Sequence, residues 1–168
     1  MRIALATDAW HPQLNGIDKN LPAFLDLDLP GSKVVVGSGP ARDDLIKKFP
    51  DIQFRMAAND TELARYYNVP DAFIFPSLTD TFGLVMLEAL ACGVPVAAFP
   101  VTGPLDVIRE NGPGVLSDDL RAAAIAALDI SPEACRDYAL EFSWDRVVDQ
   151  FLSFLAVETP EPRLMTGT

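Results

Sequence analysis

The segment Ala72–Pro100, AFIFPSLTDTFGLVMLEALACGVPVAAFP, constrains the fold more than any other part of the chain. Its apolar runs Ala72–Phe75 and Val96–Phe99 are typical of strands buried in a parallel sheet. Between them, Gly83–Cys92 has helical spacing, and Gly93 follows as a residue suited to ending a helix. The order strand, loop, helix, turn, strand predicts a βαβ unit with a right-handed crossover.

The same alternation extends along most of the chain. The other predicted strands are Arg2–Thr7, Lys33–Gly37, Ile52–Arg55 and Gly114–Leu116. The other predicted helices are Lys19–Leu27, Ala41–Phe49, Thr61–Tyr67, Gly103–Glu110, Ser117–Leu128, Pro132–Phe142 and Trp144–Val157, with Asp118, Ser131 and Ser143 as N-caps of the last three. The pattern predicts an α/β fold with a doubly wound, mainly parallel sheet of about six strands, helices on both faces and a C-terminal helical segment. We expect one domain over residues 1–157 and a flexible tail over 158–168.

Composition excludes several function classes. The formal net charge of −11 argues against nucleic acid or an anionic membrane as the main partner. No apolar run is long enough for a transmembrane segment, and the N-terminus lacks the pattern of a signal peptide. Cys92 and Cys135 lack the spacing of metal ligands, so we expect no metal site and reduced thiols in a cytoplasmic protein.

In parallel α/β sheets, ligands bind at the carboxyl ends of the strands. Two glycine-containing turns fall there: Gly37 and Gly39 follow one predicted strand, and Thr102 and Gly103 follow another. Glycine lets the backbone approach a ligand closely, and a Thr hydroxyl offers a hydrogen bond. Considered alone, the Gly37–Gly39 segment is better explained as an ordinary helix-entry turn, because position 42 is Arg and G-x-G-x-x-G is incomplete, whereas for Thr102 and Gly103 the two explanations are equal.

Two carboxylates, Asp80 and Glu88, flank the start of the predicted helix 83–92. Carboxylates in this arrangement can accept hydrogen bonds from sugar hydroxyls, while the amides of Phe82 and Gly83 are placed to meet an anion. A dipole-stabilising Asp and a solvated Glu are the structural alternative.

Glu88 separates these two interpretations. It lies between Leu84, Leu87 and Ala91, on what the spacing predicts to be the apolar side of the helix. A carboxylate on such a face requires a partner, which favours the functional interpretation.

Lys19 opens the first predicted helix beside a strand end, where it could pair with a phosphate or simply be a surface lysine. His11 is the single histidine. Because no partner is positioned near it in the sequence, we expect a structural or exposed loop histidine rather than a catalytic base.

Taken together, the segments KVVVGSGPARDDL, FIFPS, TDTFGLVMLEALACGVPV and VTGPLDVI resemble the C-terminal, donor-binding half of retaining glycosyltransferases with the GT-B fold, of the family 4 type. The resemblance covers residues 17–157 and implies a Rossmann-like domain that binds a nucleoside diphosphate sugar as donor substrate, without a further cofactor.

The resemblance also implies roles for single residues. The family's pair of carboxylates eight positions apart falls on Asp80 and Glu88, with Asp in place of the first Glu. Glu88 would then hold the ribose, and Asp80, Thr81, Phe82 and Gly83 would face the sugar diphosphate. Lys19 matches the family's phosphate-binding lysine, which makes Lys19 and Asp80 the implied catalytic residues.

The chain also departs from that family. Residues 1–16 resemble only the opening of the family's N-terminal domain, and the remainder of that acceptor-binding domain is missing. Leu14 occupies the place of a basic residue that would stabilise the leaving diphosphate. Met56 replaces a usual strand-end Gly, and Leu78 replaces a polar loop residue. We therefore predict that residues 1–7 supply the central strand of the sheet.

Three functions remain open at this point. The leading one is transfer of a hexosyl group with retention from a nucleoside diphosphate sugar, by a domain that is incomplete alone. The second is a non-catalytic nucleotide-binding or protein-interaction module, which could form a homo-oligomer through the surface left by the missing domain. A dinucleotide-dependent oxidoreductase is disfavoured, because G-x-G-x-x-G does not follow the first strand.

Overall fold

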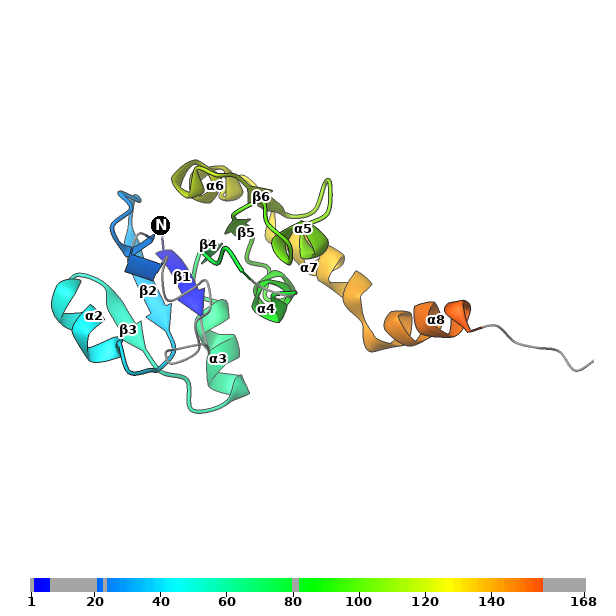
Figure 1. Ribbon diagram of the computed structural model, residues 1–168, viewed down its shortest axis with the longest axis horizontal. Helices are drawn as coiled ribbons and strands as arrows, with labels where there is room; N and C mark the ends of the chain where they lie inside the picture. The colour runs from blue at the N-terminus through cyan, green and yellow to red at the C-terminus, as the bar shows by residue number, and fades with distance from the viewer. Residues whose placement is uncertain (1, 7–20, 23, 80–81, 156–168) are drawn as a thin grey trace, which may run out of the picture.

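A computed structural model describes residues 2–6, 21–22, 24–79 and 82–155 of the chain (Figure 1). Within these residues the fold belongs to the α/β class, as predicted, with parallel strands alternating with helices along the chain. The six strands are β1 Arg2–Ala6, β2 Ser32–Val36, β3 Gln53–Arg55, β4 Ala72–Phe75, β5 Val96–Ala98 and β6 Gly114–Leu116.

The six strands form one parallel sheet in the order β3-β2-β1-β4-β5-β6. Every neighbouring pair is parallel, and in β1 and β2, for example, Ala4 lies opposite Val34. Strand β1 lies between β2 and β4, which is the central position predicted for residues 1–7. The strand order reverses direction between β1 and β4, and in sheets of this kind ligands bind at the carboxyl ends of the strands near such a point.

Alternate residues of the strands pack into two separate cores, one on each face of the sheet. In β4, Ala72 and Ile74 contribute to the first core, whereas Phe73 and Phe75 contribute to the second. All four side chains are fully buried, as expected for a strand covered on both faces. The first core also takes in Leu21, Phe24, Leu25 and Leu29 and side chains of helix α6 (Leu120–Ala127). The second takes in side chains of helices α4 (Leu84–Ala91) and α7 (Pro132–Ala139).

The helices begin close to the predicted positions. Helices α2 (Arg42–Lys48) and α3 (Asp60–Tyr67) follow β2 and β3, and α5 (Pro104–Val107) follows β5. Helix α5 ends earlier than predicted, because the backbone leaves the helical region at Ile108 and Asn111 then takes a left-handed turn.

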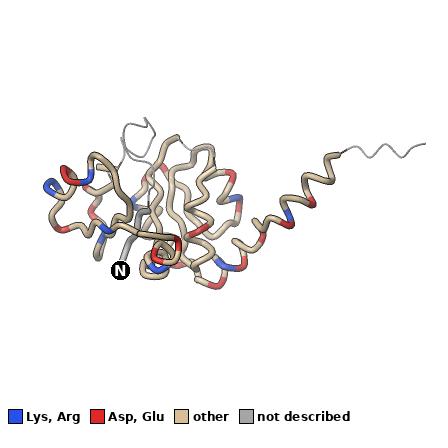
Figure 2. The backbone as a smooth tube through the Cα atoms, turned by 90° about the horizontal axis from the view of Figure 1, so that it is seen from below, with Lys and Arg blue, Asp and Glu red and all other residues tan. Residues whose placement is uncertain are grey.

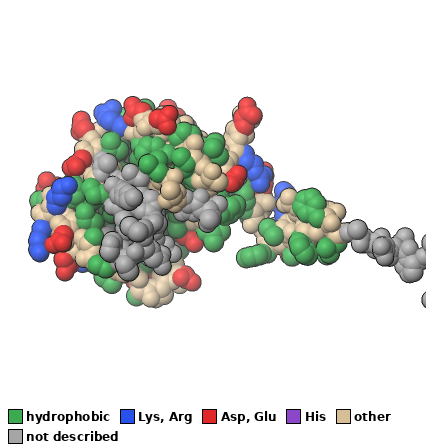
Figure 3. All heavy atoms as spheres, in the orientation of Figure 1, with side chains coloured by type: hydrophobic (Ala, Val, Ile, Leu, Met, Phe, Trp, Pro, Cys, Tyr) green, Lys and Arg blue, Asp and Glu red, His purple; other side chains and the backbone are tan. Residues whose placement is uncertain are grey.

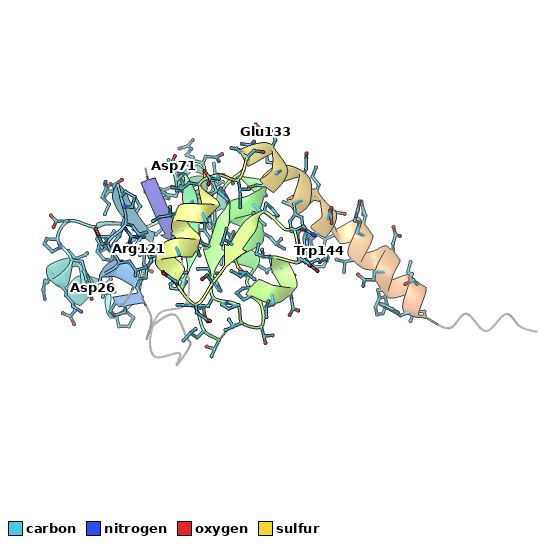
Figure 4. The ribbon with its side chains drawn as sticks, turned by 90° about the horizontal axis from the view of Figure 1, so that it is seen from above. Asp26, Asp71, Arg121, Glu133 and Trp144 are labelled. Atoms are coloured by element: carbon cyan, nitrogen blue, oxygen red, sulfur yellow. The ribbon has the colours of Figure 1, made fainter. Side chains whose placement is uncertain are left out.

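The N-caps of the later helices are mostly as predicted. The Ser131 hydroxyl caps α7, and the Ser143 hydroxyl caps α8 (Trp144–Phe154). For α6 the prediction was wrong by one residue. Asp119, not Asp118, is the cap, since its carboxylate accepts a hydrogen bond from the Ala122 amide at 3.0 Å. Arg121 in the same helix donates to the Asp28 carbonyl oxygen at 2.6 Å and ties α6 to the segment before β2 (Figure 4).

The chain leaves the body of the domain after α7. A short 3-10 turn, η1 (Leu140–Phe142), connects α7 to α8, and α8 projects away from the sheet (Figure 1). Trp144 lies at this junction (Figure 4). None of the residues of α8 is buried, and apolar side chains cover much of its visible surface (Figure 3).

Charged residues are dispersed along the described backbone, with Lys and Arg positions interspersed among Asp and Glu positions (Figure 2). Across the same residues, none of the helices has the length and apolar character needed to cross a membrane.

Candidate functional site

A cavity of about 450 Å³ lies beyond the carboxyl ends of β2 and β3, between helices α3 and α4. This volume is within the range of small-molecule sites, about 300–1,000 Å³. The lining residues come from the ends of both strands and from both helices: Val36, Gly37, Ser38, Met56, Ala57, Asp60, Leu63, Tyr67, Val85 and Glu88. The cavity therefore occupies the edge of the sheet at which the sequence predicted ligand binding.

Helix α4 brings Glu88 to the cavity. Gly83 precedes its first turn with φ of +81°, a left-handed conformation that glycine adopts without steric cost. A β-carbon at that position would also collide with Met86 Cε. This turn starts the helix so that Met86, Ala89 and Leu90 face the core.

The apolar face of α4 differs from the predicted one. Leu84 is 63% exposed, and Glu88 and Ala91 are also exposed, so the stripe containing these three residues faces outwards. The helix carries apolar residues on nearly all sides, and the spacing alone therefore did not identify which side is buried.

Glu88 nevertheless has the partner that the sequence argument required. The Tyr67 hydroxyl donates a hydrogen bond to Glu88 Oε2 at 3.0 Å. Tyr67 is the last residue of α3 and is only 3% exposed, and its ring packs against Phe73 with the ring centroids 5.7 Å apart. A buried aromatic ring thus holds a carboxylate that is itself open to the cavity.

The charge of the cavity indicates which part of a ligand it suits. Its charged lining residues in the described part of the chain, Asp60 and Glu88, are both acidic. Carboxylates accept hydrogen bonds from hydroxyl groups and repel phosphates. The apolar side chains of Met56, Leu63 and Val85 complete the wall and suit a flat or aliphatic group. The cavity is thus suited to an uncharged, hydroxyl-bearing moiety.

The structure brings together some of the predicted donor residues and separates others. Gly37 and Glu88 both line the cavity. Gly39 follows two residues after Gly37 but does not line it, and Thr102 and Gly103 lie at the start of α5, away from its walls.

The remaining predicted residues lie at the start of α4 or outside the residues that the structure describes. Gly83 is buried at the N-terminus of α4, and the neighbouring Phe82 is 38% exposed. Lys19, Asp80 and Thr81 lie outside the described residues, as do Leu14 and His11.

Sequence reasoning missed Tyr67, Asp60 and Ser38 as residues of the site. Tyr67 and Glu88 are 21 positions apart, and nothing in the local pattern links them. For Tyr67 the one available signal was its place at the C-terminal end of a predicted helix, where the ring completes an apolar face while the hydroxyl remains able to reach a partner.

Metal-binding groups and reactive thiols are the other groups that could form a site in the described part of the chain. Within the described ranges, no group of three or more His, Cys, Asp or Glu side chains is placed to hold a metal ion. Cys92 and Cys135 are free thiols. Burial raises the pKa of Cys135 to about 11, against the smaller opposing effect of Arg136, and burial likewise raises the pKa of Cys92. Both thiols are therefore poor nucleophiles at neutral pH.

Comparisons with known proteins identify the family to which the sequence is similar. The family model described as "Glycosyl transferases group 1" matches residues 10–131. A D-inositol 3-phosphate glycosyltransferase of Geodermatophilus obscurus is 32% identical over 140 residues, which cover 79% of this chain and 30% of that protein. The corresponding protein of Mycobacterium marinum is 31% identical over 150 residues, covering 74% of this chain and 32% of its own length. The chain spans about a third of the length of these curated relatives.

Solved structures share the fold at lower identity. Sucrose-phosphate synthase from Thermosynechococcus elongatus superposes with a TM-score of 0.69 at 24% identity, over 90% of this chain and 44% of that one. Anabaena HepE in complex with UDP and glucose superposes with a TM-score of 0.63 at 16% identity, over 92% of this chain and 48% of that one.

Proposed function

This chain belongs to the group 1 glycosyltransferases, and on that premise we propose that it is a domain that binds a nucleoside diphosphate sugar, with Glu88 accepting hydrogen bonds from the ribose. The carrying observation is the Glu88 carboxylate on the wall of the cavity between α3 and α4, held by Tyr67. Solved proteins of the same fold were crystallised with UDP or with UDP and a sugar, which supports this ligand class.

The dimensions of α4 support the same ligand. Gly83 and Glu88 are five residues apart, which corresponds to about 7.5 Å along a helix axis. A ribose bound at Glu88 would leave its diphosphate to extend towards Gly83 and the positive end of the helix dipole. The acidic cavity takes the ribose and base in this arrangement, while the phosphates remain outside it.

For the chemical step, we propose transfer of a hexosyl group with retention. Lys19 would balance the charge of the diphosphate, and Asp80 and Thr81 would contact the sugar. Catalysis by this route depends on positive charge that stabilises the leaving diphosphate, and the uncharged side chain of Leu14 cannot supply it. Since the relatives are about three times longer, efficient transfer would require groups beyond those of this chain.

The test is a binding titration. UDP, GDP, ADP and their sugars are titrated into the protein by calorimetry, with Glu88→Ala and Glu110→Ala as matched variants that each remove one exposed carboxylate. We expect Glu88→Ala to weaken binding about ten-fold or more, since it removes a charged hydrogen-bond acceptor, and Glu110→Ala to have no effect. Absence of binding by every nucleotide at millimolar concentration would refute the proposal.

A second function is favoured by helix α8. Its side chains Trp144, Phe151 and Phe154 are 83%, 62% and 75% exposed, and apolar surface of this kind marks association sites. On this alternative the chain is a nucleotide-binding or protein-interaction module without transferase activity, and copies of it associate through α8. Nucleotide binding without sugar hydrolysis, together with a sedimentation coefficient that falls in Phe151→Ser, would favour it. A monomer at all concentrations would exclude the self-association.

A further inference from the structure

Tyr67 is placed to control the conformation of Glu88. Its ring is buried in the second core, against Phe73, whereas Glu88 is on an exposed position of α4. The hydrogen bond of 3.0 Å from the Tyr67 hydroxyl to Glu88 Oε2 joins the two helices beside the cavity. A rigid donor thus meets a carboxylate on a flexible side chain.

Hydrogen bonds at both ends of α3 fix the position of this donor. At the start of α3, the Asn59 side chain accepts a hydrogen bond from the Glu62 amide at 3.0 Å, and Glu62 accepts one from the Ala58 amide at 2.8 Å. At its end, the Asn68 side chain donates to the Ala64 carbonyl oxygen at 2.7 Å. The phenol ring is therefore held by its backbone as well as by its packing.

Within the described residues, one oxygen of the Glu88 carboxylate has a hydrogen-bond partner. The Tyr67 hydroxyl donates to it at Oε2. In the proposed complex, Oε1 accepts from the ligand, since Glu88 lines the cavity. An exposed Glu otherwise samples many rotamers, and binding must offset the entropy of fixing one of them.

We propose that Tyr67 is a positioning residue that preorganises Glu88 for ribose recognition. This inference rests on the proposed function, because it assumes that Glu88 receives the ribose hydroxyls. Tyr67 also lines the cavity, and in this proposal its hydroxyl acts on Glu88 rather than directly on the ligand. The Tyr67 hydroxyl affects binding through the contacts that Glu88 makes. Removing this hydroxyl therefore lowers the binding preference for a ribose over a sugar without hydroxyls.

The experiment measures this preference. Whichever of UDP, GDP and ADP binds most tightly is compared with its 2′,3′-dideoxy analogue by calorimetry, in wild type, Tyr67→Phe, Glu88→Gln and the double variant. We expect Tyr67→Phe to weaken binding of the ribonucleotide about five-fold and to leave binding of the dideoxy analogue unchanged. In the Glu88→Gln background, Tyr67→Phe should have a smaller effect, since the two residues act as one unit.

Tyr66→Phe is the matched control. Tyr66 is the preceding residue of the same helix, is half-buried in the same core and does not line the cavity, so the same chemical change there should leave both affinities unchanged. Thermal melting of each variant reports folding separately from binding.

The outcomes distinguish this inference from the function on which it rests. If Glu88→Gln abolishes the ribose preference and Tyr67→Phe does not alter it, Tyr67 has no positioning role. If Tyr67→Phe weakens both nucleotides equally, its role is structural and the inference is overturned. If Glu88→Gln leaves the preference intact, or the wild type shows none, the ribose assignment fails and this inference fails with it.

Discussion

Helices α4 and α8 are both rich in apolar residues, but the chain uses them in opposite ways. In α4, Met86, Ala89 and Leu90 are buried in the second core. In α8 no residue is buried, although its apolar side chains recur at helical spacing. Helix α4 is thus fixed by packing and can present Glu88 precisely, whereas the apolar side chains of α8 are exposed. The comparison separates the residues that stabilise the domain from those available for association.

The largest expected difference comes from making the same substitution in both helices. Leu90 is fully buried in α4 and Leu152 is 54% exposed in α8. Leu90→Ala should lower the free energy of unfolding by about 3 kcal/mol, because it removes buried methyl groups and leaves a cavity. Leu152→Ala should change it by less than about 0.5 kcal/mol. Urea unfolding followed by circular dichroism measures both values. Equal losses would mean that α8 is part of the folded core.

Helix α7 packs on α4 and precedes α8 in the chain. The pH dependence of stability tests whether its residue Cys135 is buried. Burial raises the pKa of this thiol from about 9.0 to about 11, so the folded state resists formation of the thiolate. Its contribution to stability is complete below about pH 9 and is lost as the pH rises towards about 11, because the unfolded chain releases the proton first. The free energy of unfolding should therefore fall more steeply with pH in wild type than in Cys135→Ala. Parallel pH profiles would show that the thiol is accessible in the folded protein.

A substitution at Gly83 tests the turn that precedes α4 and sets the direction of this helix. Gly83→Ala should lower the free energy of unfolding by about 1–2 kcal/mol, because a residue with a side chain is disfavoured at φ of +81°. Gly39→Ala is the control, since the backbone of Gly39 is not among the left-handed positions. Thermal unfolding of the two variants gives the comparison. If both variants melt at the same temperature, the turn at Gly83 does not require a glycine.

The smallest effects come from the two serine caps. Ser131 caps α7 and Ser143 caps α8, each with its hydroxyl accepting a hydrogen bond from an amide three residues later, at 3.2 and 3.4 Å. Ser131→Ala should lower the free energy of unfolding by about 1 kcal/mol. Ser143→Ala should leave global stability unchanged and only speed local amide exchange in α8, because α8 is not packed on the domain. A global loss in Ser143→Ala would indicate that α8 contributes to the cooperative unit.

Local patterns predicted most of the fold. The strands could be placed because fully apolar runs such as Ala72–Phe75 are bounded by turn residues. The central position of β1 was predicted from the family resemblance rather than from a local pattern. Long-range packing limited the remainder. The spacing in α4 did not show that Leu84 faces solvent, because the helix is apolar all round, and the pairing of Tyr67 with Glu88 has no local signature.

The site was predicted at the level of its sheet edge and not in its details. Gly37 was identified from its place after a strand, and Glu88 from its place in the helix and from the family resemblance, and both line the cavity. Thr102 and Gly103 were grouped with them on the same reasoning. However, they follow β5, on the other side of β4 from the cavity, because adjacency of strand ends does not guarantee a shared wall.

The most direct test of the central claim, that a nucleoside diphosphate binds between α3 and α4, is its location by amide chemical-shift changes in solution. On addition of UDP, or of GDP or ADP if either binds more tightly, we predict the largest shifts at Gly37, Ser38, Gly83 and Glu88, and no shifts in α8. Shifts confined to other surfaces, such as the apolar cavity lined by Phe24, Phe99 and Leu120, would contradict the assignment of the site.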